Sequence, residues 1–254
     1  MILYFSGTGN SRLVAERLAA FLGETLCSID NESMGCRIGD GTLGIVCPVY
    51  AWGLPRIVEA FIKRLRADAG SRPRYVWAVF TCGDDIGYTD TCLDKALRAS
   101  RLGAGLDVAF SVAMPNTYVC LPGFTVDTPE VATRKVEQTL QALPQIAGRL
   151  KAQTGQGEVV RGACAWLKTY VLRPLFNAFL VSDKPFRSSE ACTGCTLCAQ
   201  QCPTRDIRMD GGRPIWLHRD CTQCLRCFHQ CPQRAIDWGS STEGKLQKRR
   251  LGRS

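Results

Sequence analysis

Two cysteine-rich blocks near the end of the chain restrict its fold more than any other feature of the sequence. The spacing C-x2-C-x2-C-x3-C-P occurs over residues 192–203 and again over residues 221–232. In each block, three closely spaced thiolates line a tight loop that fits three corners of a cubane, and the fourth cysteine crosses to the other cluster. The repeat therefore predicts two [4Fe-4S] clusters and one-electron chemistry.

The predicted ligand sets mix the two blocks. One cluster is expected on Cys192, Cys195, Cys198 and Cys231, and the other on Cys221, Cys224, Cys227 and Cys202. Zinc is the main alternative for paired cysteines, and a zinc site needs four ligands. Zinc leaves the third cysteine of each triplet and the terminal Cys-Pro pairs unexplained, so we favour iron–sulfur clusters.

The remaining composition sets the cellular context. The chain has 254 residues and 15 cysteines, and it is far larger than the small secreted scaffolds that depend on disulfides. Its first residues are typical of a strand rather than of an export signal. No stretch of about 18 residues is free of charge, which argues against a transmembrane helix. We therefore expect a cytoplasmic protein in a reducing compartment.

The charge of the chain is only moderately basic once the clusters are counted. The formal net charge is +9, and eight cluster thiolates with two oxidised cores would reduce it to about +5. This excess does not argue for a nucleic-acid partner.

The first 153 residues have the pattern of an α/β domain. Short apolar runs that are typical of buried strands alternate with helical patterns. The predicted strands are residues 1–6, 24–29, 42–48, 74–80 and 106–112. This alternation predicts a doubly wound parallel sheet. The connection over residues 30–41 is too short and too polar for a crossover helix, so we expect it to be irregular.

Three loops at the ends of predicted strands are candidates for a binding site. Residues 6–11, with the sequence SGTGNS, follow the first strand and open a helix, which makes them an anion cradle. They lack the lysine of a P-loop and the spacing of a dinucleotide-binding loop. Residues 48–55 and 81–88 follow the third and fourth strands, and they contribute Trp52 and Tyr88. Ligands bind at this end of open α/β sheets.

Both halves of the chain resemble known redox modules. The three loops resemble those of a flavodoxin over residues 1–153, and residues 190–238 resemble the bacterial two-cluster ferredoxins. The whole chain is similar to the flavodoxin–ferredoxin fusion proteins of anaerobic bacteria and archaea, also called iron–sulfur flavoproteins. The resemblance implies a flavodoxin-like doubly wound five-stranded parallel sheet, a small α+β ferredoxin-like domain, FMN and two [4Fe-4S] clusters.

The resemblance also implies which residues bind FMN. The phosphate would lie against Ser6, Thr8, Gly9, Asn10 and Ser11. Trp52 and Tyr88 would flank the isoalloxazine ring, and the peptide at Gly53 would turn a carbonyl towards flavin N5. The other expected contacts are Tyr50, Thr81, Gly83 and Asp84.

Four segments are predicted along the chain. Residues 1–153 form the FMN domain, 154–189 a helical linker, 190–239 the two-cluster domain, and 240–254 a basic tail. The tail carries charge without aromatic residues, so we expect it to be disordered. Docking to an acidic redox partner is the alternative.

The cofactor pair indicates function more directly than any catalytic motif. Flavin exchanges two electrons and each cluster exchanges one, so the chain would couple two-electron and one-electron redox partner proteins. A flavin-dependent reductase of a quinone, nitro compound or disulfide is the second hypothesis, with Cys82, Asp84, Asp85 and Tyr118 as candidates. A redox sensor or scaffold is the third. Whether the chain is an enzyme, and whether it forms a homodimer, stays open at this point.

Overall fold

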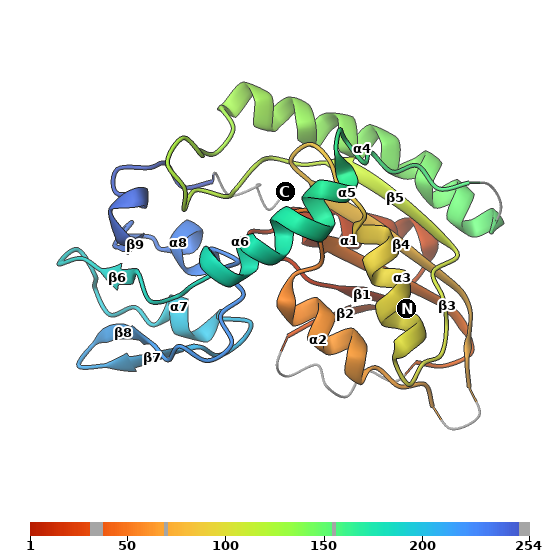
Figure 1. The fold of residues 1–254 in the computed structure, drawn as a ribbon, viewed down its shortest axis with the longest axis horizontal. Helices are drawn as coiled ribbons and strands as arrows, with labels where there is room; N and C mark the ends of the chain where they lie inside the picture. The colour runs from red at the N-terminus through yellow and green to blue at the C-terminus, as the bar shows by residue number, and fades with distance from the viewer. Residues whose placement is uncertain (31–37, 69–70, 154–155, 249–254) are drawn as a thin grey trace.

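The computed structural model describes residues 1–30, 38–68, 71–153 and 156–248. Figure 1 shows a larger α/β part beside a smaller part made of short strands and helices, and helix α6 lies between them. Cys36 and most of the irregular connection predicted over residues 30–41 lie outside the described residues.

Five parallel strands form the sheet of the larger part, in the order β2-β1-β3-β4-β5. The strands are β1 (Ile2–Tyr4), β2 (Leu26–Ser28), β3 (Gly41–Pro48), β4 (Pro73–Cys82) and β5 (Val108–Ala113). Each overlaps its predicted range. This order is that of the flavodoxin-like doubly wound sheet, so the predicted fold class of the first domain is confirmed.

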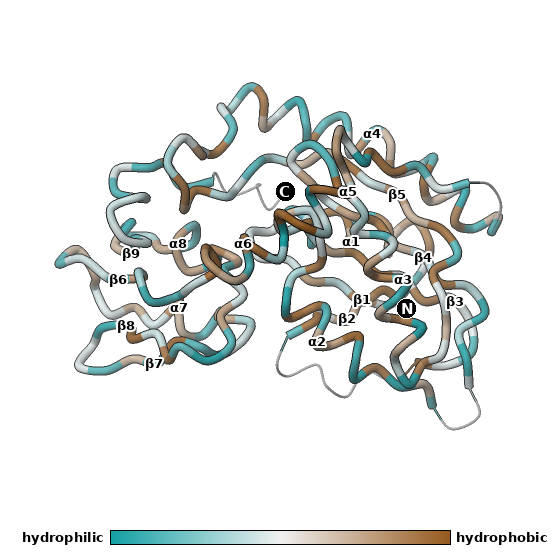
Figure 2. Tube along the Cα trace, in the orientation of Figure 1, coloured by the Kyte–Doolittle hydropathy of each residue, from teal (hydrophilic) through white to brown (hydrophobic). Residues whose placement is uncertain are grey.

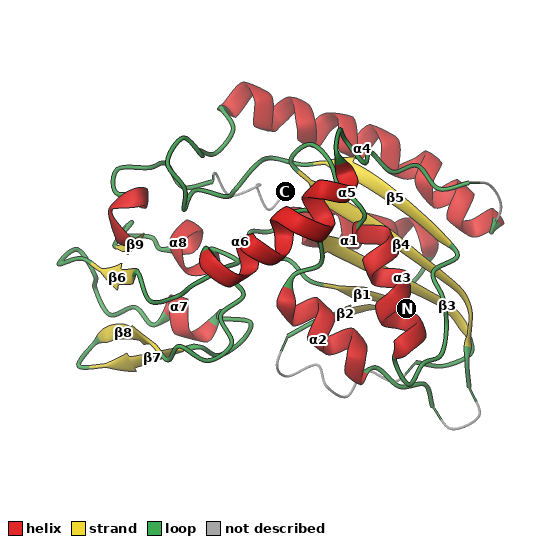
Figure 3. Ribbon diagram, in the orientation of Figure 1, coloured by secondary structure: helices red, strands yellow, loops and turns green. Residues whose placement is uncertain are grey.

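Helices cover both faces of this sheet. They are α1 (Asn10–Leu22), α2 (Arg56–Arg64), α3 (Thr89–Ala99) and α4 (Pro129–Ala152). Helices α1 and α4 pack together on one face, and α2 and α3 pack together on the other (Figure 3). Because β1, β3 and β4 are largely buried on both sides, they consist of nearly continuous apolar residues (Figure 2).

The predicted helical linker is helical only in its middle. Near its start, the carbonyl of Glu158 accepts a hydrogen bond of 2.9 Å from the amide of Ser111 in β5, so the chain is extended there. Helix α5 (Ala165–Leu167), a π-helical turn (Lys168–Leu172) and α6 (Arg173–Phe179) then follow without a break. Among the described residues, no helix has the length and apolar character needed to cross a membrane.

The smaller part is an α+β domain with two small sheets. Strands β6 (Phe186–Ser188) and β9 (Ile236–Trp238) pair antiparallel, as do β7 (Ile207–Asp210) and β8 (Arg213–Trp216). The helices α7 (Leu197–Gln200) and α8 (Arg226–Gln230) and a 3-10 turn (Gly239–Thr242) complete it. Strand β6 lies inside the segment predicted as a linker, so the strand pairing of this domain begins before residue 190.

The two parts share a hydrophobic core. Val119 and Cys120, from the loop after β5, are fully buried against Phe186, Trp216 and Phe228 of the smaller part. Burying these side chains fixes that loop to the smaller part, and the same loop borders the carboxyl end of the sheet.

The prediction of a disordered tail is wrong for the residues up to 248. The ammonium group of Lys245 donates hydrogen bonds to the carbonyls of Val119, Leu121 and Phe124, at 2.7, 2.9 and 2.9 Å. Backbone carbonyls of the loop after β5 therefore hold this end of the chain. Their positions depend on the fold and cannot be predicted from a sequence pattern. Residues 249–254 lie outside the described residues.

The packing of β3 on β4 gives a test of the fold. Gly44 pairs with Trp77, and a Cβ added at Gly44 would lie 2.2 Å from the indole ring. We expect Gly44→Ala to destabilise the protein by about 1–3 kcal/mol, since the buried ring has to move. The midpoint of denaturant unfolding measures this effect.

Gly148 provides the matched control. It lies in α4, and an added Cβ would meet no atom within 4 Å. Gly148→Ala should raise the stability by about 0.5–1 kcal/mol, because alanine favours a helix. Equal destabilisation by the two substitutions would contradict the packing described for Gly44.

Candidate functional site

The three predicted loops meet at the carboxyl end of the sheet, around a cavity of about 500 Å³. Nine of the twelve residues predicted to bind FMN line this cavity: Ser6, Thr8, Asn10, Ser11, Tyr50, Trp52, Thr81, Gly83 and Asp84. Its volume lies in the range of small-molecule and cofactor sites. The loop after β5, the end of the linker helix and the second cysteine block supply the other walls.

The Gly-rich loop is held mainly by its own polar side chains. The hydroxyl of Ser6 accepts a hydrogen bond of 3.1 Å from the amide of Gly9, and the hydroxyls of Ser11 and Thr81 lie 2.8 Å apart. The side-chain amide of Asn10 donates to the carbonyl of Pro115 at 2.8 Å. These bonds shape the loop, and the amides at the start of α1 provide the positive end for an anion.

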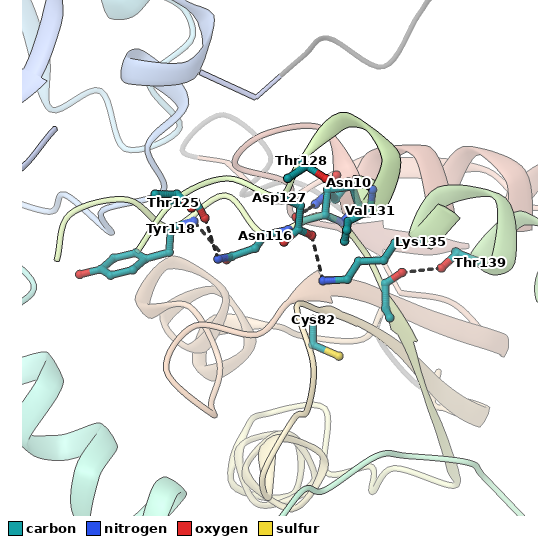
Figure 4. A network of polar contacts seen from close by, with 12 residues as sticks. Asn10, Cys82, Asn116, Tyr118, Thr125, Asp127, Thr128, Val131, Lys135 and Thr139 are labelled. Carbon is teal, nitrogen blue, oxygen red and sulfur yellow. Dashed lines mark hydrogen bonds and ion pairs between the residues drawn. The ribbon is translucent and has the colours of Figure 1, made fainter. Parts of the chain in front are cut away.

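A network of polar contacts fixes the loop after β5 (Figure 4). The carboxylate of Asp127 accepts hydrogen bonds of 2.9 Å from the amide of Asn116 and from Lys135. The side chain of Asn116 donates to the carbonyl of Thr125 at 3.2 Å. The loop is thereby closed on itself above the end of the sheet, and Tyr118 points away from the network.

A strained turn presents Trp52 to the cavity. Tyr50 and Gly53 exchange two backbone hydrogen bonds, of 2.9 and 3.1 Å, across a two-residue turn. Both residues in the turn, Ala51 and Trp52, have positive φ angles, of 46° and 59°. Non-glycine residues are strained in this conformation, and such strain is concentrated at functional sites.

The linker helix holds that turn in place. The hydroxyl of Thr169 donates to the carbonyl of Trp52 at 3.0 Å and accepts from the amide of Tyr88 at 2.9 Å. The ammonium of Lys168 lies 5.4 Å from the Trp52 ring centroid. One buried hydroxyl therefore joins the two aromatic loops.

Three of the twelve predicted residues do not line the cavity. The ring of Tyr88 packs against Tyr170, with centroids 5.9 Å apart, and beneath the guanidinium of Arg161 at 4.5 Å. Gly53 is covered by Arg173, whose Nε would lie 1.9 Å from an added Cβ. Gly9 is the residue before α1 and has a φ angle of 100°. The ring of Tyr88 therefore lies outside the cavity in which it is predicted to stack.

Three buried polar atoms on the cavity wall lack hydrogen-bond partners within the described part of the chain. They are the hydroxyls of Tyr118 and Thr222 and the side-chain carbonyl of Gln223. Thr222 and Gln223 are each only 5% exposed. Leaving such groups unsatisfied is costly, and none of the three atoms has surface open to the cavity.

The eight cysteines of the two blocks surround two further cavities. Cys192, Cys195, Cys198 and Cys231 line one, and Cys202, Cys221, Cys224 and Cys227 line the other. Within the described residues, no three potential ligands converge as they would on a single metal ion. These quartets are the ones that the spacing predicts, and they surround a volume instead of meeting at a point.

Backbone amides point at several of these sulfur atoms. The amides of Asp206, Gln223 and Ala235 donate to the sulfurs of Cys202, Cys221 and Cys231, at 3.3, 3.4 and 3.3 Å. Such bonds stabilise thiolate charge and tune the potential of a bound cluster. The residues present therefore fit iron–sulfur clusters.

The larger cavity and one cysteine quartet have a wall in common. Cys224 lines both of them. A Cβ added to Gly7 would lie 2.7 Å from the carbonyl oxygen of Cys224, so the two loops touch through a glycine. The guanidinium of Arg226 donates to the carbonyls of Ser6 and Gly7, and the second of these bonds is 3.0 Å long.

Burial controls the protonation of several groups around the cavity. It raises the pKa of Cys82 to about 12, so this thiol is protonated near neutral pH and is a poor nucleophile. It lowers the pKa of His229 to about 4, which keeps that imidazole neutral. Burial also raises the pKa of Tyr50 well above its usual value.

The cavity-lining residues that come from outside the first domain were not identified from the sequence. Phe176 of the linker and Thr222 and Gln223 of the second cysteine block all line the cavity. Gln223 stands between two cysteines whose spacing indicates only a cluster loop. No local pattern in the sequence could have connected it to the sheet.

A known protein family matches the smaller part of the structure. Residues 191–236 match the model of the 4Fe-4S dicluster domain. The chain joins a flavodoxin-like domain to a ferredoxin-like 4Fe-4S domain. The first assignment rests on the strand order of the sheet and the second on the matched family. No curated protein matches the chain.

Solved structures resemble the flavodoxin-like part only distantly. A flavodoxin from Streptococcus pneumoniae is 15% identical, covers 60% of this chain and 97% of its own, and has a TM-score of 0.38. The Trp repressor binding protein from Bacillus subtilis is 15% identical, covers 61% and 98%, and has a TM-score of 0.39. These values are too low to assign a function.

The cysteine quartets predict an exchange of ligands between the blocks. Cys231→Ser and Cys195→Ser should remove the same cluster, although the two residues belong to different blocks. Iron should fall from about eight to about four per chain, and the two variants should give matching electron paramagnetic resonance spectra after reduction.

Cys202→Ser should remove the other cluster and give a different spectrum. Cys164→Ser changes an exposed thiol outside both quartets and should leave the iron content unchanged. If Cys231→Ser instead matched Cys224→Ser, each block would hold its own cluster and the predicted ligand sets would be wrong.

Proposed function

We propose that this protein transfers electrons between FMN, bound in the 500 Å³ cavity, and two [4Fe-4S] clusters on the cysteine quartets. FMN would supply two-electron exchange and each cluster one-electron exchange. The protein would thus couple a two-electron partner to one-electron partners. The chain itself contributes the sites, their separation and the exclusion of water.

The position of Cys224 is the observation that carries this proposal. It belongs to the quartet of Cys202, Cys221 and Cys227, and it also lines the cavity of the flavodoxin-like domain. Cofactors held at these two places would be neighbours within one molecule. No second protein is needed to bring them together.

The walls of the cavity suit the parts of FMN. The Gly-rich loop and the start of α1 would hold the phosphate through Ser6, Thr8, Asn10 and Ser11. Trp52 would lie against the planar ring. Thr222 and Gln223 would border the ligand from the cluster side.

The other quartet would be the contact point for one-electron redox proteins. Cys195 is exposed, whereas no cysteine of the quartet beside the cavity is exposed. Electrons would therefore pass through the protein in order, from the flavin cavity to the inner cluster and then to the outer one, or in reverse.

One observation favours a reductase as the second candidate function. Beyond the flavin loops, the cavity is lined by Tyr118, Phe124 and Phe176, whose rings pack 5.6–5.7 Å apart around Tyr118. Such walls suit a planar apolar substrate such as a quinone. Catalysed quinone reduction by the cofactor-loaded protein would support this candidate, and its absence would favour the electron carrier.

Cofactor content tests the proposal first. Protein prepared without oxygen should contain about one FMN and about eight irons per chain. Protein loaded with iron that neither contains nor rebinds FMN would overturn the proposal, while the 4Fe-4S domain would remain.

Arg226 gives a test of the contact between the domains. Because its guanidinium fixes the cluster loop to Ser6 and Gly7, we expect Arg226→Met to loosen this contact. Electron transfer between flavin and clusters should slow by about tenfold or more, since small displacements cost large factors. Rapid-mixing spectroscopy with a one-electron reductant measures the rate, and the iron and FMN contents should persist.

Arg208→Met is the matched control, because Arg208 is exposed on β7. It removes the same charge from the same domain and should leave the transfer rate unchanged. An unchanged rate in Arg226→Met would show that the contact at Gly7 is not required.

A further inference from the structure

The last described residue of the chain reaches the Gly-rich loop. The ammonium group of Lys248 donates a hydrogen bond of 3.0 Å to the carbonyl of Thr8 and another to the side-chain carbonyl of Asn10. Both partners belong to the segment that binds an anion in the proposed function. No sequence pattern connects Lys248 with this loop, because the basic tail is predicted to be disordered.

The backbone that carries Lys248 is anchored independently of its ammonium group. The amide of Lys248 donates to Nδ1 of His229 at 3.0 Å, and the side chain of Gln247 donates to the carbonyls of Phe228 and Cys231, at 2.6 and 3.1 Å. Nε2 of His229 therefore carries the ring proton, and it donates to the carbonyl of Thr117 at 2.7 Å. Changing the Lys248 side chain leaves these anchors in place.

The Lys248 cation lacks a counter-ion among the described residues. Burial lowers its pKa to about 8, and no carboxylate acts on it to raise the pKa. Its two acceptors, a backbone carbonyl and a side-chain amide carbonyl, are neutral. Lys248 is only partly buried, and charges that are drawn out of water in proteins are normally paired, so this ammonium group favours an anion nearby.

Lys248 lies beside the loop that would hold that anion. A Cβ added to Gly9 would lie 4.0 Å from Nζ of Lys248. An ammonium group has three N–H donors, and two are used on Thr8 and Asn10. The start of α1 and this cation therefore approach the same loop from different domains.

We propose that Lys248 provides the countercharge for the phosphate of the bound flavin, so that the tail makes the site select FMN over riboflavin. The inference rests on the proposed function, since it needs a flavin in the cavity. It assigns to the tail a role in ligand binding, in place of docking to a partner protein. The phosphate would at the same time pair with the partly buried charge of Lys248, so flavin binding would tighten the contact between tail and loop.

Binding of FMN and riboflavin to the cluster-loaded full chain, freed of flavin, tests this assignment. Flavin fluorescence measures both dissociation constants. Lys248→Met should weaken FMN binding by about tenfold to 100-fold, the range for a charge-assisted hydrogen bond, and should change riboflavin binding by less than about twofold. Lys248→Arg should keep most of the FMN affinity, because it keeps the charge.

Lys151→Met is the matched control for the lost charge. Lys151 is exposed near the end of α4, and this variant should bind both flavins as the unchanged protein does. Equal weakening of FMN and riboflavin in Lys248→Met, or no weakening of either, would overturn the inference. Failure of the unchanged protein to bind any flavin would instead overturn the proposed function, so the two failures are distinguishable.

Discussion

The contact between the Gly-rich loop and the second cysteine block is the constraint on which the remaining structure depends. Gly7 lies so close to Cys224 that an added Cβ would be 2.7 Å from its carbonyl oxygen. Arg226 then closes the contact by donating to the carbonyls of Ser6 and Gly7. The cavity of the flavodoxin-like domain thereby shares a wall with a cysteine quartet of the ferredoxin-like domain.

Three other segments support this contact from different sides. The linker helix joins the two aromatic loops through Thr169. The loop after β5 buries Val119 and Cys120 in the core of the smaller domain. The tail binds both that loop and the Gly-rich loop. Since the loop after β5 and the tail each connect the two domains, the separation of the two cofactor sites is set by many bonds rather than by one flexible linker.

Local spacing made the sheet and the cysteine quartets predictable, because apolar runs and C-x2-C loops depend on near neighbours in the sequence. Contacts between distant segments were not predictable in this way. Tyr88 follows a strand as a ring-stacking residue would, yet Arg161 and Tyr170 of a later segment cover it. The tail has the composition of a disordered segment, yet Lys245 binds three backbone carbonyls whose positions exist only after folding.

The central claim is that flavin and cluster exchange electrons inside one molecule. It is tested most directly by the rate of flavin reduction after rapid one-electron reduction of the clusters, measured over a series of protein dilutions. The account predicts a first-order rate that does not change with protein concentration. A rate proportional to concentration, or no transfer in protein that contains both cofactors, would contradict it.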